Sequence, residues 1–330
     1  MSVRRSRSLV PTLVFTALVA SSCKSDPAGP DRSLSPGWSE RKPSNVARSA
    51  GVATATVNGW VYEIGGEDAH LTILGAVDAY IPSADGWHAV ASLHTPRTGL
   101  AAAAVNGIIY AVGGDGDGGY PWLSSVEAYD PAKNSWAFKA AMPNAKIAAS
   151  AAGLNGILYV VGGWTTTPDS SYMDNSLWAY DPAADHWTVK APMATRRNGL
   201  GVGVINGVLY AVGGGTVVSG SQGHCINTLE AYDPATDTWT TKAPMPTARC
   251  GVGVGVIDGV LYAVGGYPDL GAELTTVEAY DPATDSWTTM DAMPTARYSP
   301  GVAVVDQVLY AIDGSSGSGN KVHVNEAYVP

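Results

Sequence analysis

Short runs in which apolar and small residues alternate recur along this chain, separated by turn sequences. In the clearest unit, small and β-branched residues alternate over Gly251–Ile257, and Val260–Val264 returns after Asp258-Gly259. Alternation with a period of two predicts half-buried β-strands, and Asp-Gly between two such runs predicts a tight hairpin. A third strand is predicted at Thr276–Tyr280 and, after an Asp-Pro turn, a fourth at Ser286–Met290. The unit is therefore predicted to form four short strands.

The unit is repeated six times with a period of 48–52 residues. A Gly-Gly doublet follows the second strand, a Tyr lies in the third, and a Trp follows that Tyr by seven residues except in the last unit. The doublets are 65–66, 113–114, 162–163, 213–214 and 265–266, with Asp313-Gly314 in the sixth place. The aromatic residues are Tyr80, Tyr129, Tyr180, Tyr232, Tyr280 and Tyr328, with Trp87, Trp136, Trp187, Trp239 and Trp287. Each Tyr and its Trp flank one short turn and are expected to form a cross-strand pair.

The doublet, the Tyr-Asp-Pro sequence, the spaced Trp and a Met-Pro-x-x-Arg sequence before the first strand together resemble the kelch repeat, and the resemblance covers residues 38–330. Kelch repeats of about 50 residues form the blades of β-propellers. The resemblance implies an all-β protein, a six-bladed kelch β-propeller with four-stranded antiparallel blades over residues 37–330.

The two ends of the repeat region complement each other. The last unit reaches Tyr328-Val329-Pro330 without a fourth strand or a Trp, while Trp38 precedes the first unit. We therefore expect Gly37–Arg41 to pair with the strand around Val322–Tyr328 and to complete the sixth blade, which removes an exposed sheet edge.

The first 22 residues have the features of a secretory signal peptide. Basic residues precede an apolar stretch from Leu9 to Ala20, which is too short to span a bilayer and ends in small residues before Cys23. This arrangement resembles the bacterial lipobox, which implies a lipidated Cys23. Residues 24–36 are polar and Pro-rich, so the segment 23–36 is predicted to be the lipidated Cys and a flexible tether. The protein is then expected to be an exported envelope lipoprotein at the outer membrane or cell surface. An ordinary secretory signal, cleaved nearby, is the alternative.

The composition and the spacing of polar residues argue against two classes of function, nucleic-acid binding and metal binding. Charged residues are 15% of the chain and the formal net charge is −10, without a basic run, which disfavours nucleic-acid binding. The histidines show no metal-ligand spacing, and the sequence from Asp115 to Tyr120 fails the calcium-loop pattern because its third ligand position is Gly119. No metal or cofactor is predicted.

One basic residue precedes the first strand of every unit. These residues are Arg48, Arg97, Lys146, Arg197, Arg249 and Arg297. The loops entering the first strands open on one face of a propeller, so a ring of positive charge near the channel mouth is one expectation, with a carboxylate ligand such as an acidic peptide or a sugar acid. Kelch domains of ubiquitin-ligase adaptors hold acidic peptides with arginines at matching places. The alternative is structural: the six residues cap strand ends and pair with neighbouring acids.

Aromatic residues outside the repeat pattern gather in the loops after the doublets. They are Tyr120, Trp122, Trp164, Tyr172 and Tyr267. With carboxylates nearby, such a rim suits a carbohydrate or peptide ligand. The alternative is that these side chains pack under their own loops.

Glu63 departs from its own repeat. The equivalent places hold Ala111, Val160, Ala211, Ala263 and Ala311. A carboxylate at an apolar strand position requires a partner, or it has a raised pKa that suits acid–base chemistry. Pairing with a nearby base is favoured, and Glu63 is also the candidate for a catalytic residue.

Two further cysteines, Cys225 and Cys250, fall on the predicted mouth face. In an oxidising envelope they are expected to form a disulfide, and two free thiols are the alternative.

The sequence favours a binding module over an enzyme. Galactose oxidase-like copper enzymes need paired His ligands and a Tyr joined to Cys, and plant specifier proteins carry an iron motif; this sequence matches neither pattern. Exported kelch proteins that act as sialic-acid mutarotases are the alternative, because an arginine and Glu63 near the mouth would suit a sugar-acid mutarotase or epimerase. The favoured function is a membrane-anchored module that binds a protein, peptide or carbohydrate ligand at the loop face.

Overall fold

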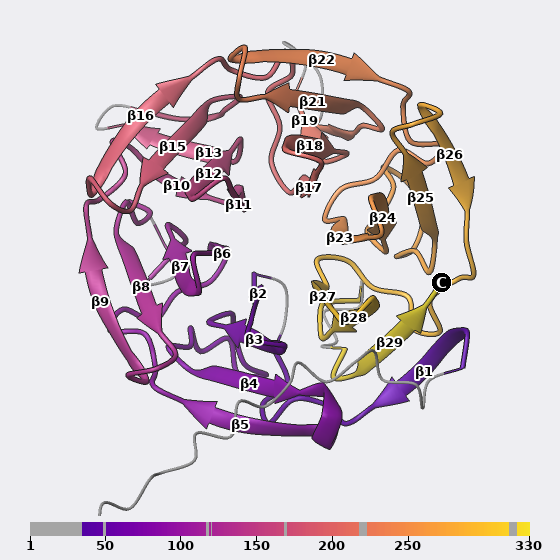
Figure 1. The fold of residues 1–330 in the computed structure, drawn as a ribbon, viewed down its shortest axis with the longest axis horizontal. Helices are drawn as coiled ribbons and strands as arrows, with labels where there is room; N and C mark the ends of the chain where they lie inside the picture. The colour runs from indigo at the N-terminus through magenta and orange to yellow at the C-terminus, as the bar shows by residue number, and fades with distance from the viewer. Residues whose placement is uncertain are drawn as a thin grey trace, which may run out of the picture.

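Six four-stranded sheets stand radially around a central channel in the part of the chain that the computed structural model describes (Figure 1). The described residues are 35–48, 51–116, 119, 121–167, 170–217, 223–316 and 322–330. The fold is the all-β propeller that the repeat pattern predicts. Within the described residues, no helix has the length and apolar character that a membrane crossing needs.

Each sheet is one antiparallel blade, with its first strand nearest the channel and its fourth at the outside (Figure 1). Blade one contains β2 (Ala53–Val57), β3 (Trp60–Ile64), β4 (Val77–Ile81) and β5 (Gly86–Val90), with the 3-10 turn η1 (Pro82–Ala84). Blade two contains β6 (Ala101–Val105), β7 (Ile108–Val112), β8 (Val126–Asp130) and β9 (Ser135–Lys139). Blade three contains β11 (Ser150–Leu154), β12 (Ile157–Val161), β15 (Leu177–Asp181) and β16 (His186–Lys190).

The second half of the chain repeats the arrangement. Blade four contains β17 (Gly201–Ile205), β18 (Val208–Val212), β21 (Leu229–Asp233) and β22 (Thr238–Lys242). Blade five contains β23 (Gly253–Ile257), β24 (Val260–Val264), β25 (Val277–Asp281) and β26 (Ser286–Thr289). Blade six contains β27 (Gly301–Val305), β28 (Val308–Ile312), β29 (Asn325–Val329) and β1 (Gly37–Arg41). In blade five, β24 has the predicted bounds, and the other three strands differ from the predicted ranges by one or two residues at their ends.

Additional short strands lie in the loops on one face of the ring. In blade three, β10 (Ala145–Ile147), β13 (Trp164–Thr167) and β14 (Ser170–Met173) form a small sheet, and in blade four β19 (Gly215–Thr216) pairs with β20 (His224–Cys225). They extend the loops between the second and third strands.

The two ends of the described chain meet in blade six, as the sequence predicts. β1 pairs antiparallel with β29, with Trp38 opposite Tyr328, and the two rings lie 5.0 Å apart between centroids. The pairing is visible at the lower right of Figure 1, where the indigo strand lies beside the yellow one. Every other blade has the same aromatic pair, with centroids 5.0–5.2 Å apart.

Neighbouring blades are joined at their outer strands by a repeated pair of hydrogen bonds. Ala91, which follows blade one, donates its N–H to the Asn134 side chain and accepts a 2.7 Å hydrogen bond from Trp136 Nε1 in blade two. Tyr129 donates its hydroxyl to the same Asn134 oxygen. Trp38 follows this rule across the closure, since its Nε1 donates to the Asp291 carbonyl after blade five at 2.9 Å.

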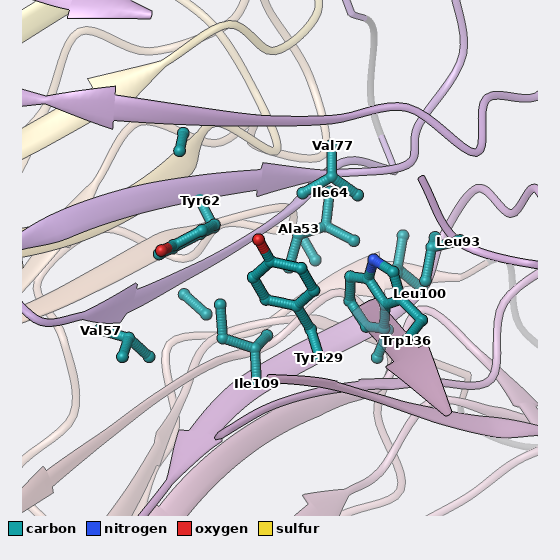
Figure 2. Close-up of a cluster of buried hydrophobic side chains, with 13 residues drawn as sticks. Ala53, Val57, Tyr62, Ile64, Val77, Leu93, Leu100, Ile109, Tyr129 and Trp136 are labelled. Carbon is teal, nitrogen blue, oxygen red and sulfur yellow. The ribbon is translucent and has the colours of Figure 1, made fainter. Parts of the chain in front are cut away.

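The core consists of apolar layers between the faces of adjacent blades. Figure 2 shows the layer between blades one and two, in which Tyr62 and Ile64 of β3 face Tyr129 and Trp136 of the next blade. Because each blade is apolar on the faces that its neighbours cover, no blade can bury its faces alone. The ring therefore has to close for every blade to be covered.

Candidate binding site at the channel mouth

A funnel of about 470 Å³ opens at the end of the channel where the first strands begin. All six blades line it. Its wall is built mainly from glycine, alanine, valine and leucine of the six entering loops, over residues 51–54, 98–102, 147–151, 199–202, 251–254 and 299–302. The funnel is therefore smooth and largely apolar.

A series of five backbone hydrogen bonds, which we call the collar, joins the six entering loops of this funnel. Gly99 N donates to Gly51 O at 2.8 Å, Ala148 N to Gly99 O at 2.9 Å, and the bonds continue through Gly199 and Gly251 to Ser299. All these residues have positive φ, and a Cβ on Gly99 would lie 2.6 Å from the Ile147 side chain. Glycine is thus required at Gly99, and the collar is fixed by main-chain contacts between blades.

Polar groups are few in the funnel. Among its described lining residues the ionisable side chains are two carboxylates, Glu67 and Asp115. Asp115 is 9% exposed and its Oδ1 accepts a 3.1 Å hydrogen bond from Gly119 N. The charge of the lining is therefore negative.

The six basic residues of the repeat do not form an exposed ring. The five arginine residues are 0% exposed and Lys146 is 1% exposed, so none of the six is available to an anion in the funnel. This corrects the expectation that Arg48, Arg97, Lys146, Arg197, Arg249 and Arg297 hold a carboxylate ligand. The alternative expectation, that these bases pair with neighbouring acids, is confirmed. Each of the six bases forms an ion pair with an acid of its own blade.

Blade two shows how the pairing works. Arg97 Nη2 lies 2.6 Å from Glu127 Oε1, and Arg97 Nη1 donates to the Gly113 and Ser125 carbonyls at 3.0 and 3.1 Å. Glu127 also accepts from His94 N and Thr95 N. The guanidinium thus satisfies carbonyls where the Gly-Gly doublet interrupts the sheet ladder, and the carboxylate neutralises it. Burial lowers the pKa of Arg197 and Arg249 to about 10, against the attraction of their Glu partners.

The acid partners share a sequence position that the basic pattern alone does not reveal. Asp78, Glu127, Glu230, Glu278 and Glu326 each lie two residues before the Tyr of their third strand. Blade three has Trp178 there instead, and Asp174 from the preceding loop pairs with Lys146. The Lys146 ammonium lowers the pKa of Asp174 to about 2, although burial opposes it. An acid two residues before the Tyr was thus the sequence signal for five of the six pairs.

Glu63 and Asp313, the two departures from the repeat, meet at the junction of blades six and one. Glu63 is 0% exposed, its Oε2 lies 3.4 Å from Arg48 Nε, and its carboxyl interacts electrostatically with that of Asp313. Asp313 Oδ2 accepts from Arg48 N and Ser44 Oγ at 3.0 and 2.9 Å. Burial raises the pKa of both carboxyls, so a proton shared by the two is favoured. Enclosed in this way, Glu63 does not line the funnel and does not reach a ligand there.

The loop aromatics fall into two groups. Tyr172 and Tyr267 are 37% and 39% exposed, whereas Trp122 and Trp164 are half-buried. The Arg196 guanidinium lies 5.9 Å from the Tyr172 ring centre, and Tyr267 packs edge-on against Tyr298 at 5.2 Å. Tyr120 lies outside the described residues, as does Cys23. Two of the four described candidates are thus accessible at the rim.

Two contacts tie the blade-four loop to blade five. Cys225 and Cys250 form a disulfide, the pair for which the sequence favoured one, and both are 6% exposed. The Cys225 N–H also donates to the Asp269 carboxylate. The blade-four loop is therefore fixed to blade five by these two contacts in the absence of a ligand. Nowhere in the described ranges do three or more His, Cys, Asp or Glu side chains form a group suited to a metal ion.

Comparisons with known proteins agree with the repeat pattern. Residues 143–317 match the family model described as the KLHDC2/KLHL20/DRC7 Kelch-repeats domain, and residues 96–143 match the Kelch motif. Kelch-like ECH-associated protein 1A of Danio rerio is 42% identical over 92 residues, which are 28% of this chain and 15% of that protein. Kelch repeat and BTB domain-containing protein 12 of Homo sapiens is 32% identical over 118 residues, 32% of this chain and 19% of that protein.

These alignments span less than a fifth of each of the two relatives. The solved structure of YjhT superposes with a TM-score of 0.74 and covers 87% of this chain and 96% of its own. Its sequence identity is 17%, so this likeness bears on the fold alone.

Proposed function

The chain belongs to the kelch-repeat family, and from that premise we propose that it is a binding module that holds a protein ligand at the channel mouth. Kelch-repeat β-propellers are commonly protein-binding modules. The two relatives are matched over only part of their length, so their names support the class of function and no particular partner.

The apolar character of the loop face is the observation that carries this proposal. Eight large apolar side chains are exposed among the described residues, and five of them lie in loops between second and third strands: Leu71, Tyr172, Val217, Tyr267 and Leu270. The loops that carry them lie on the same face of the ring as the funnel, whose collar is fixed by inter-blade backbone bonds. Exposed apolar groups on a pre-formed concave surface favour protein recognition, because little has to be ordered on binding.

The sugar-acid mutarotase alternative has less support. That reaction requires a basic group to hold the sugar carboxylate and an acid–base group near the anomeric carbon. The described lining contains no basic side chain, and both Arg48 and Glu63 are 0% exposed. A glycan ligand without a carboxylate is compatible with Tyr172 and Tyr267 at the rim and is a possible outcome of the test below.

We further propose that the protein is exported and anchored through a lipid on Cys23, at the outer membrane or cell surface. The support is the basic, apolar and small-residue order of residues 1–23, together with a disulfide, a bond typical of oxidising compartments. Labelling of cells with radioactive palmitate tests this, because Cys23→Ser should abolish incorporation whereas Cys225→Ser should not.

The experiment for the binding proposal compares the mature protein with Ala102→Trp on a peptide array and a glycan array. Ala102 lines the funnel and is half-buried against the apolar layer between blades one and two, so an indole there should occupy the funnel, and an unchanged melting temperature of the variant is the control for its folding. We expect peptide spots that bind the wild type and lose most of their signal with the variant. Retained signal would contradict the site, and accelerated anomer exchange of a sialic acid by the wild type alone would contradict the assignment as a binding module.

A further inference from the structure

The junction between blades six and one, which we call the closing junction, contains three polar residues that depart from the repeat. Glu63 lies where the other blades have Ala or Val, Asp313 where they have the first Gly of the doublet, and Asn325 where they have Val or Leu. All three residues are 0% exposed. Glu63 shares a face of β3 with Val61, and Asn325 shares a face of β29 with Ala327. These faces form the apolar layer between the two blades, so the polar departures lie inside the closing junction.

Three buried carboxyls meet a single guanidinium at this junction. Arg48 Nη2 pairs with Asp78, which is 3% exposed, and Arg48 Nε lies 3.4 Å from Glu63 Oε2. The main-chain N–H of Arg48 donates to Asp313 Oδ2 at 3.0 Å. Buried carboxylates in excess of their counter-charge repel one another, so a proton on Glu63 or Asp313 is favoured while the junction is closed. The raised pKa of both carboxyls, which burial causes, has the same direction.

Two further charged groups face Asp313. Arg297 is neutralised by Glu326, whose Oε2 lies 2.9 Å from Arg297 Nη2, so this pair adds no net charge to the junction. His323 is exposed to solvent, which screens its charge, and its Nε2 lies 2.8 Å from Ser44 O. Ser44 Oγ in turn donates to Asp313 Oδ2 at 2.9 Å. The excess of buried carboxyls over bases therefore remains.

Hydrogen bonding is incomplete in the same place. Glu63 Oε1 and Oε2, Asp313 Oδ1 and Asn325 Oδ1 are buried without a hydrogen-bond partner among the described residues. All four are acceptors, so a proton on either carboxyl supplies a donor that the ionised groups lack. Ten buried side-chain atoms of the described chain have no such partner, and all but Arg197 Nε belong to blades six and one or to the segments that enter them. Unpaired buried groups are costly, which makes this the weakest of the six junctions.

The collar is interrupted at the closing junction. Its five bonds run from Gly51 O through the loops of blades two to five to Ser299 N, and the described residues contain no sixth bond between Ser299 and Gly51. The first strands of the two blades are joined by Thr54 Oγ1, which donates to Val302 O at 2.8 Å. At the mouth, main-chain bonds therefore fix five junctions, whereas the closing junction depends on side-chain contacts.

We propose that the closing junction is a proton-controlled opening in the ring, which stays closed while Glu63 or Asp313 holds a proton and opens locally when both are ionised. In the open form, water reaches the carboxylates and the unpaired oxygens, and the repulsion is relieved. The other five junctions have small or apolar residues at the places of Glu63 and Asp313, so they stay closed. Such local opening costs less free energy than global unfolding.

This inference goes beyond the proposed function, because it concerns the ring and not the ligand. The funnel residues 51–54 and 299–302 come from the two blades that meet at the closing junction. Its opening therefore widens the mouth, and a rise in pH changes the surface that a ligand meets.

Thiol labelling inside the junction tests the inference. Ala303→Cys introduces a thiol in the layer between blades six and one, and Ala103→Cys is the matched control between blades two and three. Both alanines are the third residue of a first strand and are 7% exposed. Both variants are made in a Cys23→Ser background, in which Cys225 and Cys250 are joined and do not react. Labelling by dithiodipyridine is followed at pH 5 and pH 8, and the ratio of the two rates cancels the pH dependence of the thiol itself.

We expect the ratio of the Ala303→Cys rate to the Ala103→Cys rate to rise at least about threefold from pH 5 to pH 8. Loss of one proton changes the opening constant by at most about tenfold per pH unit. Glu63→Gln has no proton to lose at this position and should abolish the rise. Asp306→Asn removes an exposed carboxyl at the hairpin turn of blade six and should preserve it.

Two results would overturn the inference. One is a ratio that stays constant with pH, whether both thiols react faster or neither does, and the other is a rise that persists with Glu63→Gln. If Ala303→Cys does not fold, Val305→Cys and its control Val105→Cys take its place, since these valines are 5% and 4% exposed in the same two layers. The labelling uses no ligand, so failure of the array experiment would leave this inference standing, and its own failure would leave the proposed function standing.

Discussion

At the scale of single residues, the molecule places one charged pair inside each blade. Removing a base and an acid from water is costly, and apolar residues of similar size are often as stabilising. The pairs have a second role here, because the arginine fork donates to carbonyls where the Gly-Gly doublet interrupts the sheet ladder. Around Arg249 these are Gly265 O and Thr276 O, and Thr276 O also accepts the Gly265 N–H. This explains why a buried cation recurs in every unit.

Replacing one buried base should therefore destabilise the protein strongly. Arg249→Met leaves Glu278, 2% exposed, as an unpaired buried charge, and we expect a loss of about 3–5 kcal/mol in the free energy of unfolding by urea. The exposed Arg196→Met is the matched control and should change it by less than about 1 kcal/mol. Arg249→Met/Glu278→Leu should recover at least half of the loss. A single variant as stable as the control would contradict the pairing.

The Glu63–Asp313 pair predicts a pH dependence of stability. Both pKa values are raised in the folded protein from ordinary values of 4.5 and 3.8, so above about pH 4 the folded state binds more protons than the unfolded state. Stability should then fall as the pH rises towards the raised pKa values. Glu63→Gln keeps a donor to Asp313 and has no proton to lose, so its urea midpoint should fall less between pH 5 and pH 8.

The control for this pH experiment is Glu67→Gln, which makes the same substitution at a nearby, half-exposed residue. Its urea midpoint should change with pH as that of the wild type does. If Glu63→Gln and wild type gave parallel midpoint profiles over that range, the shared proton would not exist.

At the scale of elements, neighbouring blades are connected by hydrogen bonds between their outer strands and turns. The residues that form these bonds recur at fixed positions in the repeat. The left-handed residue of each outer turn, such as Asp237 with φ 52°, accepts both the Tyr232 hydroxyl and the N–H of Ala191 from the preceding blade. Trp239 Nε1 donates to the same Ala191 at its carbonyl. Because these contacts depend on residues at fixed offsets, the strands, turns and aromatic pairs could be predicted from the repeat.

The loops could not be predicted to the same depth. The sequence located the basic residue of each pair but not the acid two residues before the Tyr in five of the blades, so it left open whether the cations are exposed or paired inside. The loop aromatics lie outside the repeat, and their exposure depends on contacts such as that of Trp164 Nε1 with the Asn198 side chain, 3.1 Å away. Such contacts join segments from different blades, which periodicity does not reveal.

The disulfide belongs to this scale because it joins the loop of blade four to the first residues of blade five. The two cysteines are 25 residues apart, and a cross-link of that span stabilises by about 2–4 kcal/mol. The double variant Cys225→Ser/Cys250→Ser should have a free energy of unfolding in urea that is lower than that of the wild type by this amount. Reductant should lower the midpoint of the wild type and leave the double variant unchanged. Equal sensitivity of both proteins to reductant would show that this bond does not contribute.

At the scale of the whole molecule, the funnel exists only because six blades form a closed ring. Its lining comes from every blade, and its collar passes from blade to blade through main-chain bonds. The strand β1 provides the closure, with five residue pairs to β29 and the Trp38 bond to Asp291. The binding proposals therefore depend on this closure.

Truncation at two neighbouring points measures the closure directly. Deletion of residues 1–34 leaves β1 in place, whereas deletion of 1–41 removes it and leaves blade six with three strands. Calorimetric melting of the two proteins is the decisive comparison. We predict one cooperative transition for the shorter deletion, and for the longer one a transition lowered by at least about 5 °C or split in two. Identical melting curves would contradict a ring closed by β1.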